Sequence, residues 1–139
     1  MKNILSILLI LISLNVSCQS ARDEKINLVG VWILTDYNNP DRFKDTWEFT
    51  TDNIFNELKF KADGDTTLVP DENGTWLLKG EKLTITVTGE DTRGEQKLYK
   101  KPQILEFEIT KRGEDYVLSV PVDGGASDGK TTKLRLTKK

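Results

Sequence analysis

The sequence of 139 residues contains no histidine and only one cysteine, Cys18. Histidine is the side chain that most often exchanges protons near neutral pH, so its absence removes the commonest general acid or base. A single cysteine cannot form a disulfide within the chain. Neither histidine-based catalysis nor an internal disulfide is therefore available to this sequence.

The sequence also lacks a surplus of either charge. It holds 20 basic and 22 acidic residues, and the two signs are interleaved along the chain. Nucleic-acid binding proteins carry clustered lysines and arginines with a positive balance. We therefore expect no nucleic-acid partner.

No apolar run is long enough to cross a membrane. The longest covers residues 4–14, whereas a helix needs about 20 apolar residues to span a bilayer. This run follows Lys2 and precedes Cys18, an arrangement typical of a secretory signal. The sequence predicts a cleaved signal peptide over residues 1–17, in preference to a transmembrane anchor or a core helix.

The segment LNVSC, residues 14–18, resembles the lipobox of bacterial lipoproteins, in which the cysteine becomes the first residue of the mature chain and carries acyl groups. The resemblance implies lipidation of Cys18 and a polar, flexible tether over residues 18–27. It also implies attachment to the bacterial cell envelope, at the periplasmic or surface face of the outer membrane. A free thiol is the alternative.

From residue 28 onward, polar and apolar residues alternate in short segments separated by turn formers. Residues 84–88 read Thr-Ile-Thr-Val-Thr, and residues 105–109 read Leu-Glu-Phe-Glu-Ile. A period of two predicts half-buried β-strands, and no segment has the apolar stripe of a helix. Eight or nine strands over residues 28–139 predict one all-β domain, an antiparallel sandwich or a closed barrel.

The alternation also predicts which aromatic side chains point inward. A small barrel is either filled by such side chains or encloses one small ligand. Six aromatic residues are candidates for contact with a ligand in the interior: Trp47, Phe49, Phe60, Trp76, Phe107 and Tyr116.

Two short motifs and their order suggest a family. Gly-x-Trp opens a predicted strand at Gly30 and again at Gly74, and a Lys-Gly-x-Lys-Leu-Thr-Ile segment follows at residues 79–85. With Arg135 on the last predicted strand, this order resembles the lipocalin superfamily and the lipocalin-like domains of bacterial lipoproteins. The resemblance implies an eight-stranded up-and-down barrel in which Gly30 and Trp32 lie at the closed end and Arg135 covers the indole of Trp32. These three residues are then structural.

Evidence for chemistry is weak. Glu106 and Glu108 alternate outward on a predicted strand and indicate a solvated face. Aspartates such as Asp63 and Asp65 lie in turns, without the ligand spacing of a calcium-binding EF-hand. We expect no enzymatic activity, no bound metal and no cofactor.

Two functions remain open. One is a lipid-anchored carrier whose barrel holds a small apolar molecule. The other is a filled barrel that binds or inhibits another envelope protein through residues 41–44, 89–103 and 121–129. The basic residues of segment 89–103 are also suited to an anionic head group, with a solvated hairpin as the alternative.

Overall fold

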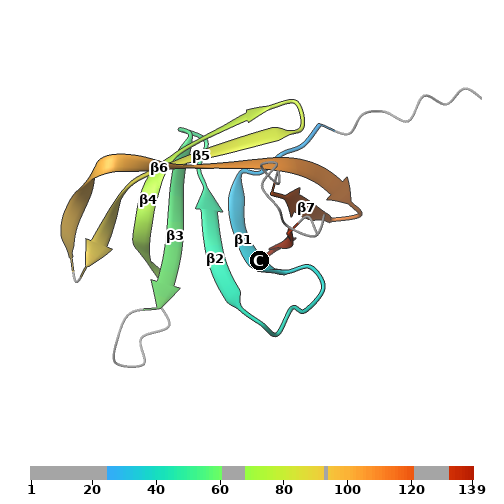
Figure 1. The fold of residues 1–139 in the computed structure, drawn as a ribbon. Coiled ribbons are helices and arrows are strands. Elements are labelled where there is room, and N and C mark those ends of the chain that lie inside the picture. Colours follow the sequence, from blue (N-terminus) through green and yellow to red (C-terminus); the bar gives the residue numbers. More distant parts are fainter. Residues whose placement is uncertain (1–24, 61–67, 93, 121–131) are drawn as a thin grey trace, which may run out of the picture.

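The computed structural model describes residues 25–60, 68–92, 94–120 and 132–139, which form eight strands and no helix (Figure 1). The strands pair antiparallel in chain order and the last pairs with the first, so the sheet closes into an up-and-down barrel. This confirms the predicted fold and excludes the sandwich. The strands are β1 (Gly30–Asp36), β2 (Lys44–Phe49), β3 (Ile54–Phe60), β4 (Leu68–Lys79), β5 (Lys82–Thr92), β6 (Glu95–Arg112), β7 (Asp115–Ser119) and β8 (Lys133–Lys138).

The alternation of the sequence becomes the two faces of the sheet. On β5, Leu83, Ile85 and Val87 are buried, while the threonines between them are only half-buried. Successive side chains of a strand point to opposite faces, so one face of β5 supplies the core and the other meets solvent. In the part of the chain that the structure describes, no helix is long and apolar enough to cross a membrane.

The barrel has two different ends, because the connections between antiparallel strands alternate from one end to the other. The closed end holds the turns at residues 50–53, 80–81 and 113–114, together with the N-terminal segment 25–29. The mouth holds the β1–β2 connection, residues 37–43, and the tip of the β5–β6 hairpin. In Figure 1 the N-terminal segment and the β4–β5 turn lie at the top, and the β1–β2 connection lies at the bottom.

Register shifts interrupt three neighbouring strand pairs between the two ends. They fall at Asn56/Leu58, Asn73/Gly74 and Val87/Gly89. A Cβ atom on Gly74 would lie 1.9 Å from the carbonyl oxygen of Thr86, so the two backbones approach too closely for a larger residue. Bulges bend and twist a sheet. Beyond them the β5–β6 hairpin projects away from the rest of the barrel (Figure 1, left).

The core is densest near the closed end. Its largest fully buried side chains are Phe49, Phe55, Leu28, Leu83, Ile85, Ile109, Leu118, Leu136 and Val87. Of the described residues none with a polar or charged side chain is buried. The interior of the barrel is thus apolar, and the polar groups that approach it lie toward the mouth.

Candidate functional site: the barrel interior and its mouth

The deep half of the interior is a cluster of aromatic rings in mutual contact. The ring of Phe49 lies 5.5 Å from that of Trp76 and 5.7 Å from that of Phe55, centroid to centroid. Trp47 lies 5.2 Å from Phe55 and 6.2 Å from Phe107. These separations are typical of packed aromatic pairs. The rings fill this half of the barrel against one another.

Five of the six candidate ligand residues belong to this interior. Trp47, Phe49, Phe107 and Tyr116 are buried, and Trp76 is partly buried against them. The backbone of Phe60 ends β3, and its side chain lies outside the described residues. Contact of these residues with a ligand stays a prediction.

Phe55 is a core residue that the sequence analysis missed. Its side chain is 2 % exposed and contacts both Trp47 and Phe49. β3 turns Phe55 inward, so Glu57 follows on the same face two residues later. Alternation counted from Phe55 places Phe55 on the inward face of the strand. Alternation counted from the aromatic Phe60, near the end of the strand, places Phe60 inward and Phe55 outward, and the sequence prediction followed Phe60.

The N-terminal segment is fastened to the closed end. The indole Nε1 of Trp32 donates a hydrogen bond of 2.6 Å to the carbonyl oxygen of Leu28. The hydroxyl of Tyr116 accepts a hydrogen bond from the backbone N–H of Asn27 at 3.1 Å and lies 3.3 Å from the Asn27 carbonyl oxygen. Ile26 also packs on the core. Contacts with the barrel therefore begin inside the stretch expected to be a flexible tether, two residues before residue 28.

The cation that covers Trp32 is a lysine, so the assignment of Arg135 to this position was wrong. Lys138 Nζ lies 4.6 Å from the centroid of the Trp32 ring and donates a hydrogen bond of 2.9 Å to the carbonyl oxygen of Val29. A Cβ atom on Gly30 would lie 2.6 Å from this amine, so the absence of a side chain at Gly30 leaves room for it.

Arg135 instead lies on the outer face of β8. Its guanidinium is 5.0 Å from the ring centroid of Tyr37, and its Nε is 4.0 Å from a carboxylate oxygen of Asp115. The physical reason is the two-residue period of a strand. Leu136 points into the core, so Arg135 beside it points out, and Lys138 shares the inward face and pairs directly with Trp32.

A hydrogen-bonded turn shapes the β1–β2 connection at the mouth. The carboxylate of Asp36 accepts hydrogen bonds from the backbone N–H groups of Asn38 and Asn39 at 2.9 and 3.0 Å. Its other oxygen lies 3.3 Å from the guanidinium of Arg42. The backbone hydrogen bonds, followed by the charge of Arg42, lower the pKa of Asp36 because they stabilise the ionised form.

The mouth half of the interior consists of the inward positions between the aromatic cluster and the mouth. Acidic side chains line one side of it. Asp45 shares the inward face of β2 with Trp47, and Glu57, which pairs with Trp47, shares that of β3 with Phe55. Burial raises the pKa of Glu57, and the charges of nearby carboxylates, Asp45 and Glu72 among them, raise it further against the opposing effect of Lys59. Within the part of the chain that the structure describes, no side chain donates a hydrogen bond to Glu57.

Tyr99 joins this acidic side from the β5–β6 hairpin. Its hydroxyl lies 2.9 Å from a carboxylate oxygen of Glu72 and 3.3 Å from one of Glu90. The hydrogen bond to Glu72, followed by desolvation, raises the pKa of Tyr99, so the phenol stays protonated and donates. Lys97 closes the group with an ion pair of 3.4 Å to Glu90.

Apolar side chains line the other side of the mouth half. Leu105 on β6, Val120 after β7 and Leu134 on β8 are partly buried and pack against the core. The strand order places β6–β8 across the barrel from β2–β4. The mouth half therefore presents an apolar wall and an acidic wall that face each other.

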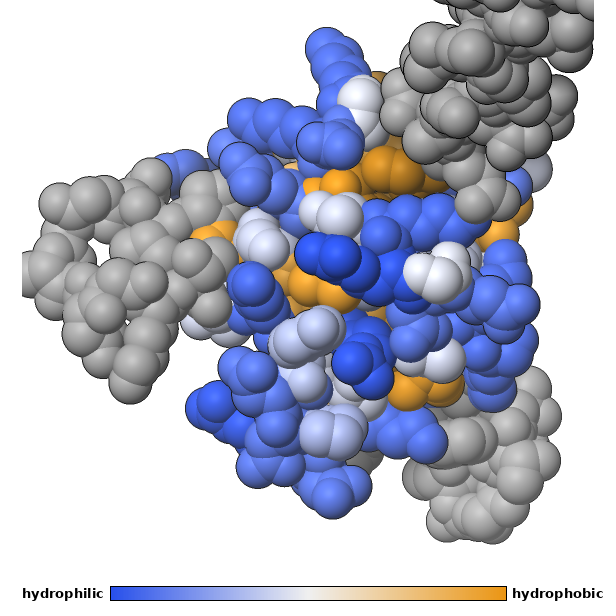
Figure 2. All heavy atoms as spheres, turned by 90° about the vertical axis from the view of Figure 1, so that its right-hand side faces the viewer, coloured by the Kyte–Doolittle hydropathy of each residue, from blue (hydrophilic) through white to orange (hydrophobic). Residues whose placement is uncertain are grey.

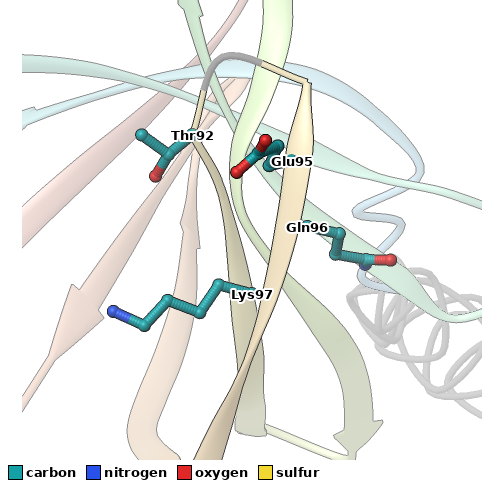
Figure 3. Close-up of a pocket in the computed structure, with 4 residues that line it drawn as sticks. All are labelled: Thr92, Glu95, Gln96 and Lys97. Carbon is teal, nitrogen blue, oxygen red and sulfur yellow. The ribbon is translucent and has the colours of Figure 1, made fainter.

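Two hollows lie in the part of the molecule built by β3–β6. One, of about 710 Å³, is at the tip of the β5–β6 hairpin, between Thr92 from the end of β5 and Glu95, Gln96 and Lys97 from the start of β6 (Figure 3). Another, of about 630 Å³, runs along the outer face of β3 and β4. Figure 2 shows one side of the molecule, where hydrophilic residues predominate and apolar surface appears in separate spots.

No metal centre can be assigned from the arrangement of side chains. Among the described residues, no group of three or more histidine, cysteine, aspartate or glutamate side chains is placed to hold a metal ion. The cysteine of the chain, Cys18, lies outside these residues.

The family follows from comparison with known proteins. The family model described as a lipocalin-like domain matches residues 28–137, which include seven of the strands and β8 up to its penultimate residue. The chain therefore belongs to the lipocalin-like domain family, a fold that generally binds ligands without catalysis. No curated protein matches the sequence.

Proposed function

We propose that this protein is a lipid-anchored binding protein of the bacterial cell envelope that takes up a small ligand in the mouth half of its barrel. The anchor rests on the apolar run at residues 4–14 and on Cys18 after it. The binding role rests on the lipocalin-like fold and on the contrast between the two halves of the interior.

That contrast also defines the class of ligand. The deep aromatic rings are packed together, which leaves the mouth half as the place where a ligand meets partly buried groups. Leu105, Val120 and Leu134 suit an apolar body, and the carboxylate of Glu57 suits a cationic or hydrogen-bond-donating group. The single observation that carries the proposal is the half-buried Glu57, which has no side-chain donor among the described residues and lies opposite an apolar wall.

Three probes with the same chain and different head groups test this proposal. Decyltrimethylammonium and decyl sulfate, each below its critical micelle concentration, and decanol below its solubility limit are titrated while the intrinsic tryptophan fluorescence, which includes that of Trp47, is recorded. We expect the cationic probe to bind at least about tenfold more tightly than the anionic one, a difference of about 1.4 kcal/mol. Absence of saturable binding by all three probes would contradict a ligand site in the barrel.

A pair of matched variants locates the preference. Glu57→Gln should reduce the advantage of the cationic probe, because it removes one carboxylate of the acidic wall. Glu106→Gln changes a carboxylate on the outer face, 3.0 Å from Lys82, and should leave the preference unchanged. Equal loss in both variants would show that the preference comes from the overall charge of the protein.

The filled-barrel interaction module is the second candidate, and two exposed side chains favour it. Leu98 is 70 % exposed and Ile104 is 66 % exposed, and both flank the projecting part of β6. The two side chains lie six residues apart on β6, and exposed apolar surface can take part in contact with another protein. Under this alternative, Leu98→Ser with Ile104→Ser would abolish co-purification of one defined envelope protein and leave probe binding intact.

A further inference from the structure

The N-terminal segment, residues 25–29, lies at the closed end of the barrel. Leu28 is 1 % exposed there and accepts the hydrogen bond from Trp32. Asn27 and Val29 are bonded there to Tyr116 and Lys138. A chain held at successive residues leaves the barrel at that end.

The length of chain before this exit is short compared with the barrel. Cys18 precedes Lys25 by seven residues, which reach at most about 25 Å when fully extended. The wall strand β1 also has seven residues and spans about 23 Å. A lipid on Cys18 could bring the mouth to a membrane only if most of the tether ran extended along the barrel wall, whereas the closed end needs no such extension.

The charges of the closed end suit an anionic surface. The closed end comprises segment 25–29, residues 138–139 and the three turns, each turn taken with one flanking residue on each side. These residues include four acidic side chains. The described connections at the mouth, each taken with one flanking residue on each side, contain as many acidic as basic residues. The six basic residues of the closed end are Lys25, Lys79, Lys82, Arg112, Lys138 and Lys139.

We propose that the closed end docks on an anionic membrane surface, so that the mouth points away from the membrane toward the aqueous phase. This inference rests on the proposed anchor at Cys18. Each lysine or arginine near an anionic bilayer adds a modest attraction, and a surplus of two charges would not hold the free domain. Once the acyl chains confine the domain to the surface, a small preference is enough to orient it.

Lysine acetylation on vesicles tests the orientation, because the chain carries exposed lysines at both ends. The lipidated protein purified from membranes is placed in vesicles of phosphatidylcholine alone or with phosphatidylglycerol. It is treated with a membrane-impermeant acetylating reagent and read by mass spectrometry. We expect Lys79 and Lys139 to be protected several-fold by phosphatidylglycerol, and Lys44 and Lys101 at the mouth side to be acetylated equally on both vesicles. Equal protection at the two ends, or protection at the mouth side, would overturn the proposal.

Two variants check that charge is the cause. Lys79→Glu with Lys139→Glu should remove the protection of the remaining closed-end lysines, because it reverses the surplus of charge. Lys44→Glu with Lys101→Glu makes the same change in net charge at the mouth side and should leave that protection in place. If both double variants lose it equally, the docking surface is not the closed end.

A parallel experiment tests the docking of the closed end independently of the proposed lipid anchor at Cys18. The mature chain starting at Cys18 is coupled through its thiol to a maleimide phospholipid and tested on the same vesicles. Mass spectrometry of the natural N-terminal peptide reports whether Cys18 is acylated. An unmodified natural cysteine would refute the anchor, whereas unprotected closed-end lysines on the coupled protein would refute the docking.

Discussion

The deep half and the mouth half of this barrel use the same strands for different purposes. β2 contributes Trp47 and Phe49 to the deep half and Asp45 to the mouth half, and β3 contributes Phe55 and then Glu57. Along each strand the inward side chains change from large and apolar to acidic within two residues. The division indicates that the closed end contributes most of the stability, and under the proposed function the mouth half binds the ligand.

The largest expected effect of a single change lies in the deep half. Phe49 is fully buried among Trp47, Phe55 and Trp76, so Phe49→Ala should lower the free energy of unfolding by about 3–5 kcal/mol. Urea denaturation followed by tryptophan fluorescence measures this loss. The comparison variant is Ile104→Ala on the exposed outer face, with an expected change within about 0.5 kcal/mol. Similar losses in the two variants would contradict a stability concentrated in the deep half.

An intermediate effect should separate the two cations of β8. Lys138→Met removes the amine over Trp32 and its hydrogen bond to Val29, and should cost about 1 kcal/mol. Arg135→Met removes a part-exposed guanidinium that is 4.0 Å from Asp115, so a smaller cost is expected. Thermal unfolding of both variants measures the order. A larger loss for Arg135→Met would restore Arg135 as the more important structural cation.

The smallest expected effect is a pH-dependent gain in stability from a substitution in the mouth half. Burial raises the pKa of Glu57 above its ordinary value of 4.5, so the folded state binds the proton more tightly than the unfolded state. The stability that this group contributes is present below pH 4.5 and is lost as the pH rises through the pKa of the folded state. Glu57→Gln should therefore stabilise the protein at neutral pH by at most about 0.5 kcal/mol.

This gain should vanish on acidification. Unfolding free energies of the wild type and Glu57→Gln, measured by denaturant titration from neutral to acidic pH, should converge below the ordinary glutamate pKa. A variant that is less stable than the wild type at neutral pH would show that Glu57 has a favourable ionic partner in the folded state.

The sequence allowed the architecture to be predicted because period-two alternation is a local property. Leu83, Ile85 and Val87 alternate with threonines, and the structure buries all three. The wrong prediction for Arg135 did not come from this alternation. The family resemblance required an arginine over Trp32, although the parity set by Leu136 already placed Arg135 outward and Lys138 inward.

The acidic wall could not be predicted, because it depends on register. Glu57, Glu72 and Tyr99 come from three strands, and bulges between those strands decide which residues are opposite one another. Each bulge changes the parity of everything that follows it on one strand. Alternation within a strand contains no information about this offset between strands.

The pairing of β1 with β8 has a consequence for biosynthesis. These strands come from the two ends of the barrel sequence, and Trp32 lies directly opposite Lys138. The first strand has no permanent neighbour on that edge until the residues of β8 have been synthesised. The barrel can therefore close only after the last strand is available to pair with the first.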